Sequence, residues 1–478
     1  MERSFYLFGI RRDSLSASPV LLFMHVVIVG NGVAGIEAAL AVRAREPGWR
    51  ITLVSEESDH FFSRTALMWV LCGQLSHRDI EPYERDLYER MSFSRVRARA
   101  VGVDVESQLL RLSGSHDPLS YDRLLLACGS RPRPAPWPGA ELAGVGHFVT
   151  LQDLAWLERE LHGGPAHDRP EREDAHVTRT AEDSPYRPRA DLARERGRAR
   201  RLVVVGGGLI GIEVVEAALA AGLRPDFVIR EEWFWPMAID RRESTWIAER
   251  MREHGVQVHL EHDVEALEGD ERGRVAAVRT SAGHFECDLC VVCIGVVPNT
   301  GWLEGAGIER DAGGGILVDT GLRTSAPSVF AAGDCASVLQ ADGSRRPEPL
   351  WYSARAQGRV AARSLLGDDA VYERGLPYNS AKLMDVEYTT VGCVDARGGH
   401  DEWFFEETGR VRSTTRIVHE GGRVVGFNLL GRRWDNEVLA RWIDEGRSLG
   451  YVLAHLGEAA FDTELVPKLK LPKELLAA

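Results

Sequence analysis

The stretch His25-Val-Val-Ile-Val29-Gly30-Asn31-Gly32-Val33-Ala34-Gly35 decides the fold, and Leu202-Val-Val-Val205-Gly206-Gly207-Gly208-Leu209-Ile210-Gly211 repeats its pattern later in the chain. Each copy reads as an apolar strand, a glycine turn and a helix. In such a turn the first glycine permits the sharp bend, the second lets a pyrophosphate approach the backbone, and the third lets helix and strand pack closely. The phosphates then lie on free N–H groups at the positive end of the helix. We therefore expect two dinucleotide-binding folds.

The residues that end the next strand of each copy bear on ribose recognition. Glu56 follows the apolar run Ile51–Ser55, at the distance where a carboxylate binds a ribose diol. After the second copy, the run Asp226–Ile229 ends in Arg230, Glu231 and Glu232. An acid there favours NADH and an arginine favours the 2′-phosphate of NADPH, so the two signals conflict and we expect NAD(P)H, with NADPH slightly favoured.

Composition sets the protein class. A chain of 478 residues with 44% hydrophobic and 27% charged residues predicts a globular protein of two or three domains. A net charge of −13 argues against nucleic-acid binding. Seven cysteines, an odd number without framework spacing, indicate reduced thiols and a cytoplasmic location. No run reaches the ~18 apolar residues of a transmembrane span. Met24 immediately precedes the first strand, so we expect residues 1–24 to be an N-terminal extension, with Met24 as the native start.

Three further motifs follow in a fixed order. Ala127-Cys128-Gly129 ends a buried strand, Gly295-Val-Val-Pro298-Asn299 ends another, and Gly333-Asp334 follows a third apolar run. With the two glycine turns, this order resembles the pyridine nucleotide–disulfide oxidoreductase superfamily over residues 25–365. Within it, the chain is similar to the branch that lacks a redox disulfide, which contains ferredoxin and rubredoxin reductases and the flavin portion of nitrite reductases.

The resemblance implies an α/β fold with two Rossmann-like domains, one for FAD and one for NAD(P), and a small α+β C-terminal domain. The expected boundaries are 25–160 and 319–377 for the FAD-binding domain, 201–318 for the NAD(P)-binding domain and 378–478 for the C-terminal cap or interface domain. Between the first two, residues 163–200 are rich in Arg, Glu, Asp and Pro with few large apolar residues, which predicts a disordered insertion.

The resemblance also assigns site residues. The FAD-binding set is Gly30, Gly32, Val33, Ala34, Gly35, Glu56, Arg64, Ala127, Cys128, Gly129, Gly333 and Asp334. The NAD(P)H-binding set is Gly206, Gly208, Leu209, Ile210, Gly211, Glu213, Arg230 and Gly295. No catalytic residue is certain, and the candidates near the flavin are Arg64, Glu213, Trp351 and Gln357. Cys128 replaces the threonine of the family's Ala-Thr-Gly turn, which puts one side-chain hydrogen bond in doubt.

Cysteine chemistry is disfavoured. Cys72 comes a turn or two late for the family's redox cysteine and has no partner in sequence, so a buried structural thiol is the preferred interpretation. The spacing of Cys287, Cys290 and Cys293 suggests a metal site, but they fall on a strand, where Cys290 is expected to face away from the other two. No metal is therefore expected.

These features predict an FAD-dependent NAD(P)H:acceptor oxidoreductase, in which hydride passes to the flavin and electrons pass to an acceptor. The first choice of acceptor is a small ferredoxin- or rubredoxin-like iron–sulfur protein. A quinone is second, because the tail from Pro467 could lie on a membrane surface, and oxygen stays open. An alternative is a non-enzymatic flavin-binding subunit that docks through residues 378–478, where Trp403, Trp434 and Trp442 suit an interface, a core or a homodimer contact equally well.

Overall fold

The computed structural model describes residues 24–162, 201–340, 343–395, 399–408 and 412–461, together with Leu469 and Leu471. The extension expected before Met24 and the insertion expected at 163–200 lie outside the described residues, as does most of the tail from Pro467. No helix within the described part of the chain is long and apolar enough to cross a lipid bilayer.

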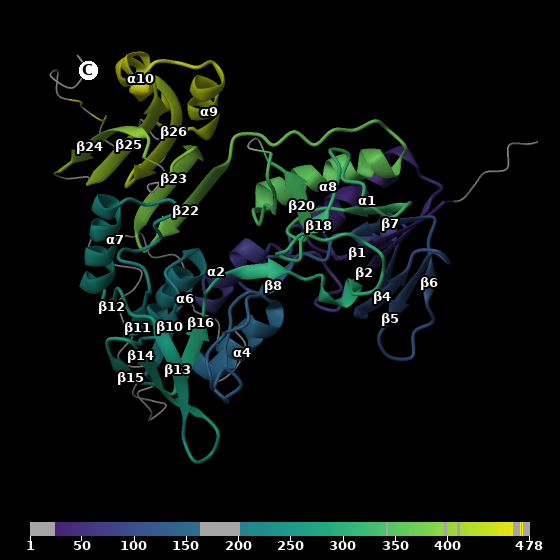
Figure 1. The fold of residues 1–478 in the computed structure, drawn as a ribbon, viewed down its shortest axis with the longest axis horizontal. Coiled ribbons are helices and arrows are strands. Elements are labelled where there is room, and N and C mark those ends of the chain that lie inside the picture. The colour runs from purple at the N-terminus through teal and green to yellow at the C-terminus, as the bar shows by residue number, and fades with distance from the viewer. Residues whose placement is uncertain are drawn as a thin grey trace, which may run out of the picture.

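The first nucleotide unit is built on a parallel sheet in the order β19-β7-β1-β2-β3, of which Figure 1 labels β7, β1 and β2. Its central strand β1 (His25–Val29) is buried along its whole length, which is typical of a parallel sheet covered on both faces. The other strands are β2 (Arg50–Val54), β3 (Phe93–Val96), β7 (Arg123–Leu126) and β19 (Val329–Ala331). Helices α1 (Val33–Arg45) and α8 (Trp351–Leu365) pack against each other and against this sheet.

The second unit repeats this plan with a parallel sheet in the order β12-β11-β10-β16-β9. Its strands are β9 (Val145–Gly146), β10 (Leu202–Val205), β11 (Asp226–Val228), β12 (Gln257–His259) and β16 (Leu289–Val292). Its helices are α4 (Leu151–His162), α6 (Leu209–Ala220) and α7 (Arg241–Glu253). Helix α7 begins with a reciprocal capping box, in which Asp240 accepts from Glu243 N and Glu243 accepts from Asp240 N.

The first unit was expected to run to residue 160, but the strand and the helix that end this range pair and pack with elements of the second unit. Strand β9 pairs with β16 at the edge of the second sheet, and α4 contributes Leu154 and Leu157 to the core that contains α6. This pairing could not be predicted from the sequence, because a two-residue strand is too short to show a hydrophobic period.

Smaller sheets extend the two units. Strands β4 (Ala100–Asp104), β5 (Leu109–Leu112) and β6 (Leu119–Ser120) form one, and β13 (Val264–Gly269), β14 (Val275–Thr280) and β15 (His284–Glu286) form another. A third contains β18 (Ile316–Leu317), β20 (Ala336–Leu339) and β21 (Arg345–Pro347), so pairing with the first unit starts before the boundary expected at 319.

Strand β8 (Ser130–Pro132) pairs with β17 (Val296–Pro298). The short helices are η1 (Arg64–Ala66), α2 (Leu67–Leu71), α3 (Leu87–Arg90) and η3 (Gly301–Leu303).

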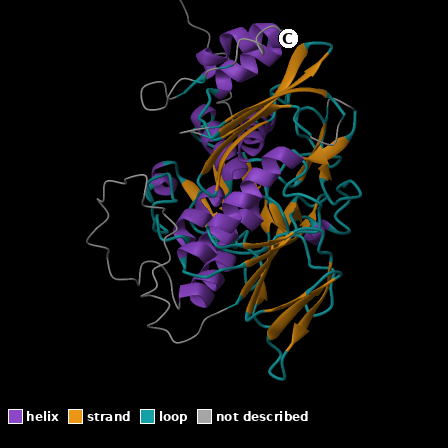
Figure 2. Ribbon diagram, turned by 90° about the vertical axis from the view of Figure 1, so that its left-hand side faces the viewer, coloured by secondary structure: helices purple, strands orange, loops and turns teal. Residues whose placement is uncertain are grey.

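The C-terminal module is an antiparallel sheet with helices on one side (Figures 1 and 2). The strand order is β22 (Tyr378–Leu383), β23 (Val386–Gly392), β26 (Arg423–Leu430), β25 (Ser413–Glu420) and β24 (Asp401–Glu407). The helices are α9 (Asn436–Asp444), α10 (Leu449–His455) and η4 (Leu456–Ala459). Trp403, Trp434 and Trp442 are buried in the core of this module, so they do not form the exposed interface considered above.

A fully buried ion pair joins the C-terminal module to the second unit. Arg416 of β25 and Glu243 of α7 are both inaccessible to solvent, and Arg416 Nε lies 3.1 Å from Glu243 Oε2. Arg416 also donates to Ala238 O at 2.7 Å, and Asn428 donates to Glu243 Oε2 at 2.9 Å. A buried charge pair that keeps its hydrogen bonds fixes the orientation of the elements that carry it.

Candidate functional site

The first glycine turn has the shape that a pyrophosphate requires. Gly30 has a φ of +116°, and a Cβ there would lie 2.0 Å from Ala127 O. A Cβ on Gly35 would lie 2.0 Å from Gly30 O, so only glycine lets α1 approach the turn. At Gly32, by contrast, a Cβ would meet no atom within 4 Å. The open position is therefore the second glycine, where a phosphate approaches the backbone.

The second turn reproduces the same three roles. Gly206 has a φ of +113°, and a Cβ there would lie 2.4 Å from Cys293 O. A Cβ on Gly211 would lie 2.2 Å from Gly206 O. Gly208 again has nothing within 4 Å of its Cβ position. Helices α1 and α6 begin immediately after the open glycines, at Val33 and Leu209, so their first N–H groups point at the open space. Both turns fit a dinucleotide.

The other motifs of the first unit converge on the first turn. Gly30 lies against Ala127 and Cys128, and a Cβ on Gly333 would touch Ala34 at 3.2 Å. Gln357 of α8 is completely buried and accepts a hydrogen bond from Gly333 N at 2.8 Å. Four segments that lie far apart in the sequence thus meet beside Gly30.

Asp334 faces this junction. Its Oδ2 accepts a hydrogen bond of 2.7 Å from Ser130 Oγ, a partner that sequence reasoning did not identify. Burial raises the pKa of Asp334, while the Ser130 hydrogen bond and the charge of Arg64 oppose that rise. Arg64 therefore lies close enough to Asp334 to interact with it electrostatically, as expected of two groups in one site.

Arg64 is held by an acid that sequence reasoning overlooked. Its guanidinium donates to Glu57 Oε1 at 2.9 Å and to Glu57 Oε2 at 2.6 Å, and also to Val149 O at 2.7 Å. Burial opposes the charge of Arg64, but the bonds to Glu57 outweigh it and the pKa of the guanidinium is raised. Glu57 also accepts from Leu151 N at 2.9 Å, so it ties Arg64 to the start of α4. Ser55-Glu56-Glu57 offers two consecutive acids, and nothing in the sequence shows which of them binds Arg64.

Glu56 lies at the end of β2, where the ribose acid is expected. Gly30 N donates to Val54 O at 2.8 Å, so the end of β2 adjoins the first turn. The Glu56 carboxylate is exposed and pairs with Arg99 at 2.6 Å. The Tyr88 hydroxyl donates to Asn31 Oδ1 at 2.9 Å and so holds the Asn31 side chain of the turn in place.

Cys128, which stands where relatives carry a threonine, lies beside Cys335. The interaction between the two thiols raises the pKa of Cys128 well above that of a free thiol and lowers that of Cys335. Cys335 is fully buried and lies 3.2 Å from Leu126 O, in the strand that leads to Cys128. The two thiols therefore pack the ends of neighbouring strands together.

The backbone connects the two nucleotide units at their turns. Strands β8 and β17 pair in antiparallel register, so Ser130 lies opposite Pro298. Asn299 N donates to Gly129 O at 3.0 Å and Arg133 N donates to Gly295 O at 3.0 Å. Gly295 has a φ of +95° and no atom within 4 Å of its Cβ position. The turn after β7 and the turn after β16 thus lie side by side.

Glu213 and Cys72 lie near one another on facing helices. Helix α2 packs against α6, and the charge of Glu213 contributes to the raised pKa of Cys72. Burial is the main cause and brings the pKa of Cys72 to about 12, so this thiol is a poor nucleophile. Burial also raises the pKa of Glu213 to about 7. Glu213 is thus a carboxyl group that changes charge near neutral pH.

Trp351 is the first residue of α8, and the Arg355 guanidinium lies 5.4 Å from the centre of its ring. Its indole Nε1 is buried and has no hydrogen-bond partner among the described residues, although an indole N–H usually finds one. Its ring meets Tyr352 edge-on at 5.3 Å. The orphaned donor is a position where a bound group can accept a hydrogen bond.

The three clustered cysteines divide between two cores, but not as the sequence suggested. Cys287 and Cys290 pack on the same side of β16, and Cys293 packs on the other side with the core of α6. The expectation that Cys290 faces away from both was wrong for Cys287, because Cys287 precedes β16 and does not follow its alternation. Burial raises the pKa of Cys287 to about 12.

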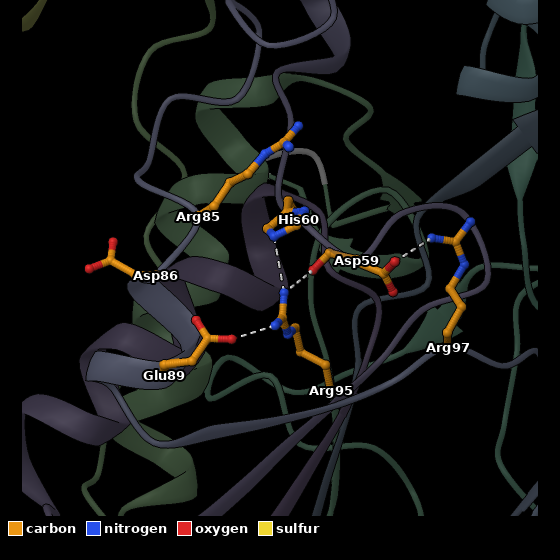
Figure 3. Close-up of a pocket in the computed structure, with 7 residues that line it drawn as sticks. All are labelled: Asp59, His60, Arg85, Asp86, Glu89, Arg95 and Arg97. Carbon is orange, nitrogen blue, oxygen red and sulfur yellow. Dashed lines mark hydrogen bonds and ion pairs between the residues drawn. The ribbon is translucent and has the colours of Figure 1, made fainter.

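A shallow pocket of about 590 Å³ lies elsewhere on the first unit (Figure 3). Its walls are Asp59, His60, Arg85, Asp86, Glu89, Arg95 and Arg97. Arg95 donates to Glu89 at 2.6 Å, and Arg97 lies 3.6 Å from Asp59, so these cations already have partners in the wall. None of the predicted site residues lines this pocket, and the candidate site remains the region between the two turns.

Comparison with known proteins agrees with this geometry. The sequence pattern of the pyridine nucleotide-disulphide oxidoreductase family matches residues 24–358. The ferredoxin reductase component of chlorobenzene dioxygenase from Cupriavidus sp. (strain PS12) is 33% identical over 419 residues, covering 87% of this chain and 88% of that protein. The ferredoxin–NAD(+) reductase subunit of the benzene 1,2-dioxygenase system from Pseudomonas putida is 27% identical over 418 residues, which cover 87% of this chain and 88% of that protein. Among solved structures, the ferredoxin reductase of the CYP199A2 system from Rhodopseudomonas palustris superposes with a TM-score of 0.70 at 25% identity, covering 85% of this chain and 91% of that one.

Proposed function

The chain belongs to the pyridine nucleotide-disulphide oxidoreductase family and is an FAD-dependent oxidoreductase that uses NAD(P)H, and we propose that it delivers the electrons to a small ferredoxin-like iron–sulfur protein. The proposal rests on two open glycines, Gly32 and Gly208, each at the start of a helix, and on the pairing of β8 with β17, which joins the two units. Two dinucleotides bound there meet where the turns adjoin.

We assign FAD to the first turn, because the residues that converge on it come from four segments and enclose it. The N–H groups after Gly32 bind the pyrophosphate, and Glu56 binds the adenosine ribose by exchanging Arg99 for the diol. Asp334, held by Ser130, lies where it can accept hydrogen bonds from the ribityl hydroxyls. Arg64, fixed by Glu57, supplies a positive charge near the flavin.

NAD(P)H is assigned to the second turn, with its pyrophosphate on Gly208 and Leu209. When both groups are bound, the nicotinamide supplies a hydride and the flavin redistributes the electron pair to one-electron acceptors. Glu213 lies just beyond the first turn of α6, which packs against α2, and we expect it to orient the nicotinamide. No nucleophile is needed, and the high pKa of Cys72 agrees with a reaction that does not use a thiol.

The acceptor is proposed from the relatives. Both curated relatives are named as ferredoxin reductase components, and this chain spans most of each. Ferredoxins carry iron–sulfur clusters, which accept one electron at a time. We also propose a cytoplasmic location, which the seven free cysteines support, since disulfides are rare in reducing compartments.

The test is a two-step reduction. The purified protein is mixed anaerobically with NADPH or NADH, and the loss of flavin absorbance is followed by stopped flow. The reduced protein is then mixed with a [2Fe–2S] ferredoxin, a rubredoxin or a water-soluble quinone. The proposal expects rapid flavin bleaching, followed by reoxidation that is fastest with an iron–sulfur protein. A colourless protein, or bleaching without reoxidation by either iron–sulfur protein, would contradict it.

A further inference from the structure

We propose that Glu348 is a positioning residue for FAD, which acts through the side-chain amide of Gln357 to fix the Gly333–Asp334 turn; this rests on the proposed assignment of FAD to the first turn. Glu348 lies between β21 and α8, and only 4% of its surface is exposed. A buried carboxylate is costly unless its oxygens are paired, so the partners of Glu348 show what it does.

Both oxygens of Glu348 accept hydrogen bonds. Oε1 lies 2.6 Å from Arg374 Nε and accepts from Gln340 Nε2 at 3.4 Å. Oε2 accepts from the Tyr372 hydroxyl at 2.7 Å and from Gln357 Nε2 at 3.3 Å. Burial, with a contribution from Glu348, raises the pKa of Tyr372 to about 12, so the phenol keeps its proton and donates at neutral pH. Arg374 and Tyr372 therefore hold the carboxylate in place beside Gln357.

Gln357 connects this carboxylate to the backbone of the turn. Its Nε2 donates to Glu348 Oε2, and its Oε1 accepts from Gly333 N at 2.8 Å. A carboxylate only accepts and a backbone N–H only donates, so the Gln357 amide satisfies both in a single orientation. If the amide turned over, its oxygen would face the carboxylate and its NH2 group would face the Gly333 N–H. Because Gln357 is fully buried, such a mismatch would leave polar groups unsatisfied.

The turn between β19 and β20 depends on this support. Gly333 has a φ of +81°, and glycine is the residue with the most backbone freedom. Gly333 N is held from α8 by Gln357, and Gly333 O accepts from Ala336 N at 2.9 Å. The next residue is Asp334, the carboxylate that we assign to the ribityl hydroxyls. A rotation of the Gly333 backbone would therefore displace a group that holds FAD.

Exchanging the two side chains tests whether they act as a pair. In Gln357→Glu, a second carboxylate faces Glu348 across a contact that is now 3.3 Å long, and the repulsion between them should displace the turn. In the double variant, Glu348→Gln with Gln357→Glu, the carboxylate at position 357 still accepts from Gly333 N. The amide at position 348 can turn its NH2 group toward that carboxylate, and the Tyr372 hydroxyl can accept from the same NH2 group. The exchange thus restores both the net charge and the hydrogen bonds.

The measurement is the rate at which the holoenzyme loses FAD, followed as the flavin absorbance that passes an ultrafiltration membrane at intervals after dilution. Thermal unfolding is recorded for each protein. We expect Gln357→Glu to lose FAD at least about tenfold faster than the unaltered protein, and the double variant to return to within about twofold. Glu348→Gln alone should lie between them, at about three- to fivefold, because two facing amides satisfy each other in either orientation.

The matched control is Asp385→Asn, which breaks another arginine–carboxylate pair. Asp385 accepts from Arg250 of α7 at 2.7 Å, between the C-terminal module and the second unit. This variant should unfold at a lower temperature and lose FAD at the rate of the unaltered protein. A change in stability alone is thereby separated from a change in the FAD site.

Two results would overturn the proposal and leave the proposed function intact. One is an equal rate of FAD loss from Gln357→Glu and from the double variant, and the other is a rate for Glu348→Gln equal to that of the unaltered protein. If Gln357→Glu does not fold but the double variant folds and holds FAD, the coupling is supported. If neither folds, the rate for Glu348→Gln decides by the same criterion. An unaltered protein that binds no FAD would instead contradict the proposed function.

Discussion

Replacing the two open glycines one at a time should remove one nucleotide and leave the other. In Gly32→Ala the new methyl group occupies the space beside the first turn, and in Gly208→Ala it occupies the space beside the second. Neither Cβ meets a protein atom within 4 Å, so the folded chain accommodates both substitutions. The methyl group instead lies where a phosphate must contact the backbone.

The structure sets the size of both effects. Gly32 has a φ of −84° and a ψ of −174°, which alanine adopts without strain, so the loss of stability should not exceed about 1 kcal/mol for a helix N-cap. Displacing a pyrophosphate weakens two charge-assisted hydrogen bonds of about 1.5–3 kcal/mol each. The corresponding loss of affinity is on the order of 10²–10⁴-fold.

Two measurements read the two sites separately. The ratio of flavin absorbance to protein absorbance, after purification with added FAD, reports the first site, and calorimetric titration with NADP⁺ reports the second. We expect Gly32→Ala to be largely colourless, and Gly208→Ala to be fully yellow but unable to bind NADP⁺. Far-ultraviolet circular dichroism should match the unaltered protein in both.

The matched control is Gly457→Ala in η4, another glycine without neighbours at its Cβ position but remote from both turns. It should retain flavin and coenzyme binding. If Gly32→Ala holds FAD at the normal ratio, or if Gly208→Ala loses flavin while it keeps NADP⁺, then the assignment of the two nucleotides to the two turns is refuted.

Three more outcomes follow from buried charges and thiols. Burial raises the pKa of Glu213 from 4.5 to about 7, so between these pH values the native state holds a proton that the unfolded chain releases, and the free energy of unfolding falls as pH rises. In urea unfolding, Glu213→Gln should therefore be more stable than the unaltered protein by up to about 3 kcal/mol at pH 8, and by little at pH 5. Cys72→Ser should leave ferredoxin reduction within about twofold of normal, since a thiol with a pKa of about 12 is almost never a thiolate at pH 8; a large loss would reopen thiol chemistry. Arg416→Met should lower the free energy of unfolding by about 3–5 kcal/mol, because it leaves the Glu243 carboxylate buried without its cation. Adding Glu243→Gln should recover part of that loss, and equal stability of the single and double variants would show that the pair is uncoupled.

The pattern of glycines was sufficient to predict the two sheets and the helices that follow them, because each glycine there answers to a separate steric requirement. It was insufficient for β9, whose two residues join the second sheet although they precede its first long strand by more than fifty positions in the chain. Such a pairing depends on the space left beside β16, and that space exists only after the chain has folded.

The site shows the same division. The glycine turns, Asp334 and Gln357 were predicted, and the structure brings Gly333, Asp334 and Gln357 together beside the first turn. Glu57 and Ser130 were missed, because each acts only through a partner distant in sequence, Arg64 in one case and Asp334 in the other. A short polar residue next to a turn gives no indication of which side chain it will orient.

The antiparallel ladder between β8 and β17 has a consequence for how the protein tolerates change. The bonds that join the turns at Gly129 and Asn299 are made by amide and carbonyl groups, which every residue type except proline supplies in full. Mutation of the surrounding side chains can therefore alter redox potential, coenzyme affinity or partner choice while the span across which the electrons move is preserved. Such a reductase can acquire new partners by side-chain substitution while the distance between its two nucleotide-binding turns stays the same.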